Sequence, residues 1–116
     1  MALQHGKLAD IQYVGSSAAS IYSNPASTKT YIRGLVLFNG NTTSELVTLY
    51  NVPDSGGSVG TAGVSNQFAE IALVAKETLI IDFDYPLVLT DTNDSLQAST
   101  TTASKVTVQI AGDKDA

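Results

Sequence analysis

Residues 75–98 read AKETLIIDFDYPLVLTDTNDSLQA, which is three β-type segments joined in one run. From Glu77 to Asp84 apolar and polar side chains alternate, and this is the period of a strand with one buried face. Ile80 is the exception, because it stands on the polar side of the alternation. Pro86 lacks an N–H group, so we expect the strand to bend or to leave its sheet there. The alternation predicts these inward side chains: Leu79, Ile81 and Phe83.

The rest of the chain repeats this pattern of short β-type segments separated by turn residues. Such spacing, without a helical period, is typical of a sandwich or barrel. Small apolar side chains favour two stacked sheets about 10 Å apart. We therefore predict an all-β, single-domain antiparallel β-sandwich, jelly-roll-like, with about eight short strands. The predicted strands span residues 7–14, 18–23, 30–39, 45–52, 68–74, 77–84, 95–99 and 105–111, with a short one after Pro86.

The length of 116 residues fits one domain with flexible ends. Residues 1–17 are expected to form an N-terminal arm, loose as far as Gly6, and a weak first strand. Residues 18–112 are expected to form the β-sandwich domain, and residues 113–116 a charged tail. The glycine- and serine-rich residues 54–65 predict a mobile surface loop.

Residues 30–39, TYIRGLVLFN, carry the longest β signal in the chain. Both faces of this strand are largely apolar, so it is either central in a sheet or in contact with a partner. Gly34 inside it predicts a bulge or the close approach of a neighbour. The Asn-Gly-Asn run at 39–41 predicts a hairpin to the strand at 45–52. The face assigned to the core consists of Ile32, Val36 and Phe38.

The opposite side of this predicted hairpin carries a second apolar set. The candidate partner interface consists of Tyr31, Leu35, Leu37, Leu46 and Tyr50. Tyrosine and leucine are suitable anchors for contacts between proteins. Three interpretations stay open: these residues form an interface, the assigned phase is inverted, or the long strand is buried on both sides.

Composition and charge exclude several classes of partner. The chain contains six Lys and Arg residues and eleven Asp and Glu residues, which gives a net charge of −5. Because this charge repels phosphate backbones, we expect no nucleic acid partner. No apolar run approaches the ~18 residues of a membrane helix, so we expect no membrane partner. The first residues lack the apolar core of a secretion signal, and we expect the chain to stay in the cytoplasm that makes it or to leave by a route such as lysis.

Patterns for catalysis and metal binding are weak. The glycines at 56–60 lack the Gly-Lys-Ser/Thr ending of a phosphate loop. Four aspartates offer oxygens that calcium prefers, but their spacing fits no EF-hand: Asp82, Asp84, Asp91 and Asp94. His5, the only histidine, is expected to be solvated on the arm, which leaves a serine nucleophile without a base. We therefore predict no enzyme activity, no catalytic residue, no metal ligand and no cofactor.

Several segments resemble a family of small structural proteins encoded by tailed bacteriophages. The resemblance rests on TKTYIRGLVLFN (28–39), VTLYNVP (47–53), DSGGSVGTAG (54–63), AEIALV (69–74), residues 75–100 and KVTVQIAG (105–112). It covers residues 18–112 and adds little before them. It implies a β-sandwich that belongs to a virion and provides no catalytic residues.

The resemblance implies a non-enzymatic virion structural protein, and capsid decoration (cement) is the role that we expect. Such a protein bridges and stabilises neighbouring major capsid subunits on the outer shell. The implied partners are the major capsid protein and the chain itself, as a dimer or trimer. The implied location is the capsid exterior, after synthesis in the cytoplasm of the host bacterium. The alternatives are a neck, tail or head-fibre component, or a host-glycan-binding module that uses the glycine-serine loop and tyrosines.

Overall fold

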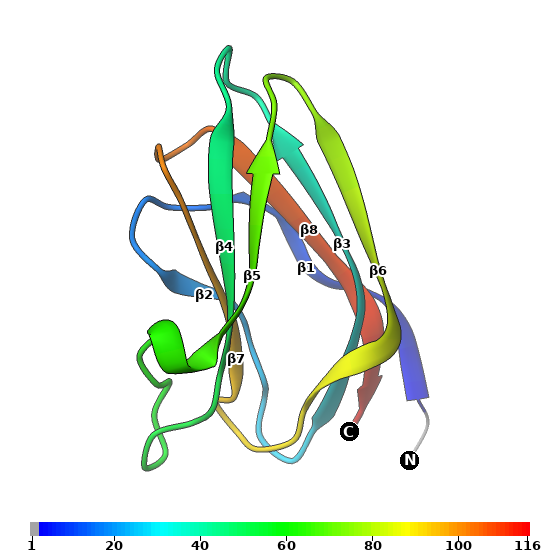
Figure 1. Cartoon of the computed structure of the whole chain (residues 1–116). Coiled ribbons are helices and arrows are strands. Elements are labelled where there is room, and N and C mark those ends of the chain that lie inside the picture. Colours follow the sequence, from blue (N-terminus) through cyan, green and yellow to red (C-terminus); the bar gives the residue numbers. More distant parts are fainter. Residues whose placement is uncertain (1–2) are drawn as a thin grey trace.

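The structure is a computed structural model that describes residues 3–116. Two four-stranded antiparallel sheets face each other (Figure 1). The apolar core draws its side chains from both sheets. Sheet A contains, in order, β1 (Leu3–Tyr13), β8 (Val106–Asp115), β3 (Lys29–Asn39) and β6 (Thr78–Leu89). Sheet B contains, in order, β2 (Ala19–Ser23), β7 (Ser95–Thr100), β4 (Glu45–Val52) and β5 (Gln67–Leu73). The predicted all-β sandwich is confirmed.

Consecutive strands cross from one sheet to the other, except at the connection from β4 to β5. This strand order is that of a jelly roll. The hairpin predicted at 39–41 is wrong, because β3 belongs to sheet A and β4 to sheet B. The physical reason is that the Asn39 amide turns inward and donates to the Thr43, Leu73 and Val74 carbonyl oxygens. These bonds lead the chain across the sandwich rather than back along its own sheet.

The two ends of the described chain form strand and not loose segments. Leu3 pairs with Asp115 and Gly6 with Gly112, at the end of the molecule where both termini lie (Figure 1). The loose arm predicted for residues 1–6 is therefore wrong from Leu3 onward, while Met1 and Ala2 lie outside the described residues. The predicted charged tail at 113–116 is likewise strand as far as Asp115. Backbone pairing holds both segments, although they bury little apolar surface.

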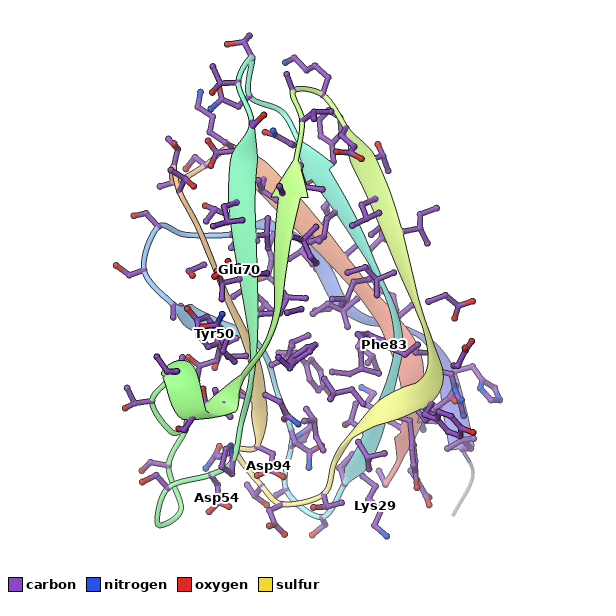
Figure 2. All side chains as sticks on the ribbon, in the orientation of Figure 1. Lys29, Tyr50, Asp54, Glu70, Phe83 and Asp94 are labelled. Atoms are coloured by element: carbon purple, nitrogen blue, oxygen red, sulfur yellow. The ribbon has the colours of Figure 1, made fainter. Side chains whose placement is uncertain are left out.

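The stretch at 75–98 folds largely as predicted. Leu79, Ile81 and Phe83 pack against the buried core, and Figure 2 shows Phe83 directed between the sheets. Ile80 is 71% exposed, in agreement with its place on the polar side of the alternation. Pro86 does not end the strand, but β6 bends strongly in this region (Figure 1). The strand therefore bends, and its pairing with β3 is interrupted between Asp82 and Leu87 and resumes at Leu87.

The connection from β4 to β5 contains the predicted glycine-serine loop. It is irregular, apart from an isolated bridge between Ser55 and Ser58 and the short 3-10 helix η1 (Val64–Asn66). Residues 3–116 contain no α-helix, and none of their helical segments has the length and apolarity needed to cross a membrane.

The orientation of β3 gives a matched pair of substitutions. Leu37 is fully buried, whereas Val36 beside it is 37% exposed on the outer face. We expect Leu37→Ala to lower the free energy of unfolding by about 2–5 kcal/mol, because it leaves a cavity in the core. Val36→Ala is expected to cost less than about 1 kcal/mol. Urea denaturation of both variants measures this difference, and equal costs would contradict the orientation.

Candidate interaction surface

A bulge at Arg33 in β3 decides which side chains reach the outer face of sheet A. Against β8, Ile32 pairs with Gly112. Gly34 pairs with the preceding residue, Ala111, so Arg33 is an extra residue in β3. If β3 alternated without a break, Ile32, Gly34, Val36 and Phe38 would share one face. The extra residue shifts the inward positions by one, so that after the bulge the side chains that would have faced inward face outward, and the reverse. The bulge predicted from Gly34 is confirmed.

This shift corrects the predicted interface. Leu35 and Leu37 are buried in the core, so the prediction that they point away from it is wrong. Tyr31 lies before the bulge on sheet A, where it is partly buried. Exposed Leu46 and partly buried Tyr50 lie on sheet B, in the other layer. The residues of the predicted set therefore do not form one surface, because β3 and β4 are not hairpin neighbours.

Two rows of neighbouring positions instead cross the outer face of sheet A. The first row contains Tyr13, Thr107, Phe38 and Thr78. The second row contains Gln109, Val36 and Ile80. Ile11 stands two residues before Tyr13, on the same side of β1. None of these positions carries a charged side chain.

Five large apolar side chains in this region are exposed, and we call them the outer apolar face. Its members and exposed fractions are Ile11 (64%), Tyr13 (62%), Val36 (37%), Phe38 (38%) and Ile80 (71%). Single exposed apolar residues are ordinary on protein surfaces. The five side chains lie on β1, β3 and β6, while β8 between β1 and β3 contributes the polar Thr107 and Gln109. Several exposed apolar side chains on one face of a sheet are typical of a surface that contacts another protein.

Charged side chains stand at the two ends of the outer apolar face. At one end a shallow depression is lined by Tyr13, Phe38, Gly40, Ser104, Lys105 and Thr107. Lys105 is exposed at the rim of this depression. At the other end Asp82 follows Ile80 by two residues on the same side of β6, and it is exposed as well. The two rows of the face are thus neutral, and Lys105 stands at one end. The next row at the other end holds both signs, since it contains Asp82 of β6 and Lys7 of β1.

A charged cluster joins three strands of sheet A beyond this face. The Asp113 carboxylate of β8 is almost buried. It accepts hydrogen bonds from Arg33 Nε of β3 at 2.7 Å and from His5 Nδ1 of β1 at 2.5 Å. The hydrogen bond from Arg33 is the main cause, and the bond from His5 the second, of a pKa of Asp113 below its usual value of 3.8. Burial acts in the opposite direction. His5, predicted as a solvated side chain on an arm, therefore lies on a strand and is hydrogen-bonded to Asp113, with its ring still largely exposed.

The lowered pKa of Asp113 makes this cluster a source of pH-dependent stability. As the pH falls, the unfolded chain binds a proton at this carboxyl at a higher pH than the folded chain does. The contribution of Asp113 to the free energy of unfolding is therefore complete above about pH 4 and is lost as the pH falls through the folded pKa. We expect Asp113→Asn to destabilise the protein at pH 7, and we expect the difference from the parent to shrink below pH 4. Unfolding at a series of pH values measures this. The exposed Asp84→Asn is the control, and a difference that persists unchanged in acid would contradict the ionic origin.

Three carboxylates meet at the end of the molecule where β6 turns into β7. Asp54, Asp91 and Asp94 bring one oxygen each within 4.8 Å of one another, and Figure 2 shows Asp54 and Asp94 close together. Asp94 accepts backbone N–H bonds from Asp54 at 2.9 Å and from Asp91 at 3.0 Å, so its charge caps this turn. Asp82 and Asp84, considered with them from the sequence, lie exposed on β6. The oxygens suit a hard cation such as calcium, but the N–H bonds already account for the arrangement.

Glu45 is a buried acid that the sequence did not single out. Its carboxylate accepts hydrogen bonds from the Thr102 N–H at 2.8 Å and from the Asn41 side-chain amide at 3.0 Å. Burial raises the pKa of Glu45, but these bonds and the charge of Lys105 outweigh it, and the pKa lies below the usual 4.5. The residue therefore joins the β3–β4 connection to the β7–β8 turn, which is a structural role.

The outer apolar face was missed by reasoning from the sequence. Ile80 gave a signal, since it broke the alternation of its strand. Ile11 and Tyr13 gave none, because only the pairing of β1 with β8 brings them beside β3. Comparison with protein-family models gives no match for this chain, and comparison with curated proteins gives none either. A functional proposal for this chain therefore rests on the outer apolar face and not on similarity to a known protein.

Proposed function

We propose that this chain is a non-enzymatic structural protein of a tailed-bacteriophage virion, which decorates the outer shell and stabilises the contacts between neighbouring major capsid subunits. The observation that carries the proposal is the outer apolar face, whose five exposed side chains favour a protein cover over contact with water. The jelly-roll architecture is compatible with this role, since viral capsid domains use it. Lectin domains use it too, so the fold by itself assigns no function.

The distribution of charge supports a place on the exterior of a shell. The net charge of −5 is unfavourable near packaged DNA and favours solubility at an exposed surface. A small module of this kind acts through many weak contacts made at once. Repeated attachment on a symmetric shell converts a modest affinity at each site into a large stabilisation of the whole.

The test compares particles that carry the protein with particles stripped of it. We expect stripped particles to release their DNA at a lower temperature and at lower ionic stress, because contacts between shell subunits lose a bridge. Adding the purified chain back is expected to restore resistance, measured as dye access to the packaged DNA during heating. Stripped particles that are equally robust, and that never rebind the chain, would contradict the proposal.

A further inference from the structure

The first half of β1 buries almost no apolar surface. Residues 3–7 are all exposed, and none of them belongs to the apolar core or packs against it. The first residue of β1 that packs against the core is Leu8. We call residues 3–7 the edge segment, because β1 is the outermost strand of sheet A and this part of it pairs with β8 alone. Apolar burial, the main force that holds a strand in place, therefore contributes little to this segment.

Irregular pairing separates the edge segment from the rest of β1. Residues 3–7 pair with residues 111–115 in an unbroken register. The register then shifts between Lys7 and Ala9, and it shifts again between Ala9 and Gln12. Such irregularities interrupt the hydrogen bonds between two strands and bend the strand that carries the extra residue. The edge segment is thus a regular ladder that ends at an irregular one.

The second half of β1 is fixed by contacts that the edge segment lacks. Ala9 packs against the core. The Gln12 side chain donates to the Ile21 carbonyl oxygen of β2 at 2.9 Å. Val14, which follows the strand, is fully buried, and its N–H donates to the Val106 carbonyl oxygen at 2.8 Å. Opening of the second half would therefore disrupt the core, whereas opening of the edge segment would break only its pairing with β8.

One polar side-chain contact joins the edge segment to its neighbour. His5 Nδ1 donates to the Asp113 carboxylate of β8 at 2.5 Å. That carboxylate is almost buried, and Arg33 of β3 holds its other oxygen at 2.7 Å. Among residues 3–116, the other polar side-chain contact of the segment runs from Lys7 to Asp10 and so stays within β1. A hydrogen bond to an ionised acceptor is stronger than one between neutral groups, so His5 is the side chain that fastens the segment.

We infer that the edge segment opens and closes as one unit while the sandwich stays folded. The irregular pairing after Lys7 is its hinge, and the bond between His5 and Asp113 is its latch. Closing the segment costs conformational entropy, which only the hydrogen bonds to β8 and the latch offset. Segments with few apolar contacts are the ones that open separately from the fold. In the open state β8 keeps its pairing with β3 but exposes its other edge over residues 111–115, so the latch controls access to these backbone groups.

Hydrogen exchange of single backbone amides, followed by NMR, tests the opening. We expect the amides that join residues 3–7 to residues 111–115, on both strands, to share one opening equilibrium. Amides at 111–115 that donate to β3 instead are expected to exchange at least about 100-fold more slowly. Opening that becomes steadily rarer from Leu3 inward would show fraying and overturn the single unit. Exchange as slow in the edge segment as between β8 and β3 would overturn the opening itself.

Removal of the latch gives the second test. His5→Ala is expected to speed exchange throughout the edge segment about tenfold, because the bond to a charged group is lost. The matched control is Gln4→Ala, which changes the neighbouring exposed residue and is expected to alter exchange less than about twofold. Equal effects of the two substitutions would overturn the role of His5. A His5→Ala protein that also loses protection at residues 106–110 would show that the segment does not open independently, and would overturn the inference as a whole.

Discussion

Gly112→Ala is expected to lower the free energy of unfolding by about 3 kcal/mol or more, or to prevent folding. A β-carbon at Gly112 would overlap the Tyr31 carbonyl oxygen and lie 3.1 Å from the Arg33 nitrogen and from Ile32 Cα. These are backbone atoms of β3, and the bulge at Arg33 brings them toward β8. A flexible side chain would move aside, but a paired backbone moves only if hydrogen bonds between the strands break.

The matched control for this change is Gly63→Ala. A β-carbon at Gly63 meets nothing within 4 Å, and its backbone is extended, with φ −166°. We expect this variant to stay within about 0.5 kcal/mol of the parent. Urea denaturation of both variants gives the comparison. A Gly112→Ala protein as stable as the Gly63→Ala protein would show that β3 and β8 do not approach as described.

Asn39→Leu is expected to cost about 3–5 kcal/mol, because it removes a buried group that closes one end of the sandwich. The Asn39 side chain is fully buried. Its amide donates to three carbonyl oxygens, at 3.0 Å (Thr43), 3.2 Å (Leu73) and 3.1 Å (Val74), and its oxygen accepts the Asn41 N–H at 2.9 Å. Leucine fills a similar volume but leaves these groups without partners, and each one loses hydration without compensation.

Asn51→Ala serves as the control for this substitution. Asn51 lies in β4, the next strand along the chain, and is exposed, so we expect its replacement to change the free energy of unfolding by less than about 0.5 kcal/mol. Thermal and urea unfolding measure both variants. Similar values for the two would contradict the role of Asn39 in leading the chain from sheet A to sheet B.

The fold class is predictable because the alternation of polar and apolar residues is local. Leu79, Ile81 and Phe83 face the core as their spacing indicates, and Ile80 faces away from it. The assignment of strands to sheets is not local. An Asn-Gly pair is the usual signal of a hairpin, and only the buried bonds of Asn39, made to residues distant in the sequence, reveal a crossing between sheets.

The outer apolar face could not be predicted from the sequence for a related reason. One extra residue at Arg33 inverts the two faces of the rest of β3, and the sequence gives only Gly34 as a hint of it. The outer residues Val36 and Phe38 were therefore assigned to the core, and Leu37 to the surface. The first residues of β1 are exposed, so they have no apolar period to predict a strand. Their pairing with β8 depends on backbone bonds and on the contact of His5 with Asp113.

Counting this chain in purified virions tests the central proposal most directly. Quantitative mass spectrometry against the major capsid protein gives the number of copies, and imaging of whole particles gives their position. We expect many copies, in a fixed ratio to the shell subunits and on the outer surface. A few copies at the portal end would indicate the neck or tail instead. Virions that do not contain the chain would contradict a structural role in the particle.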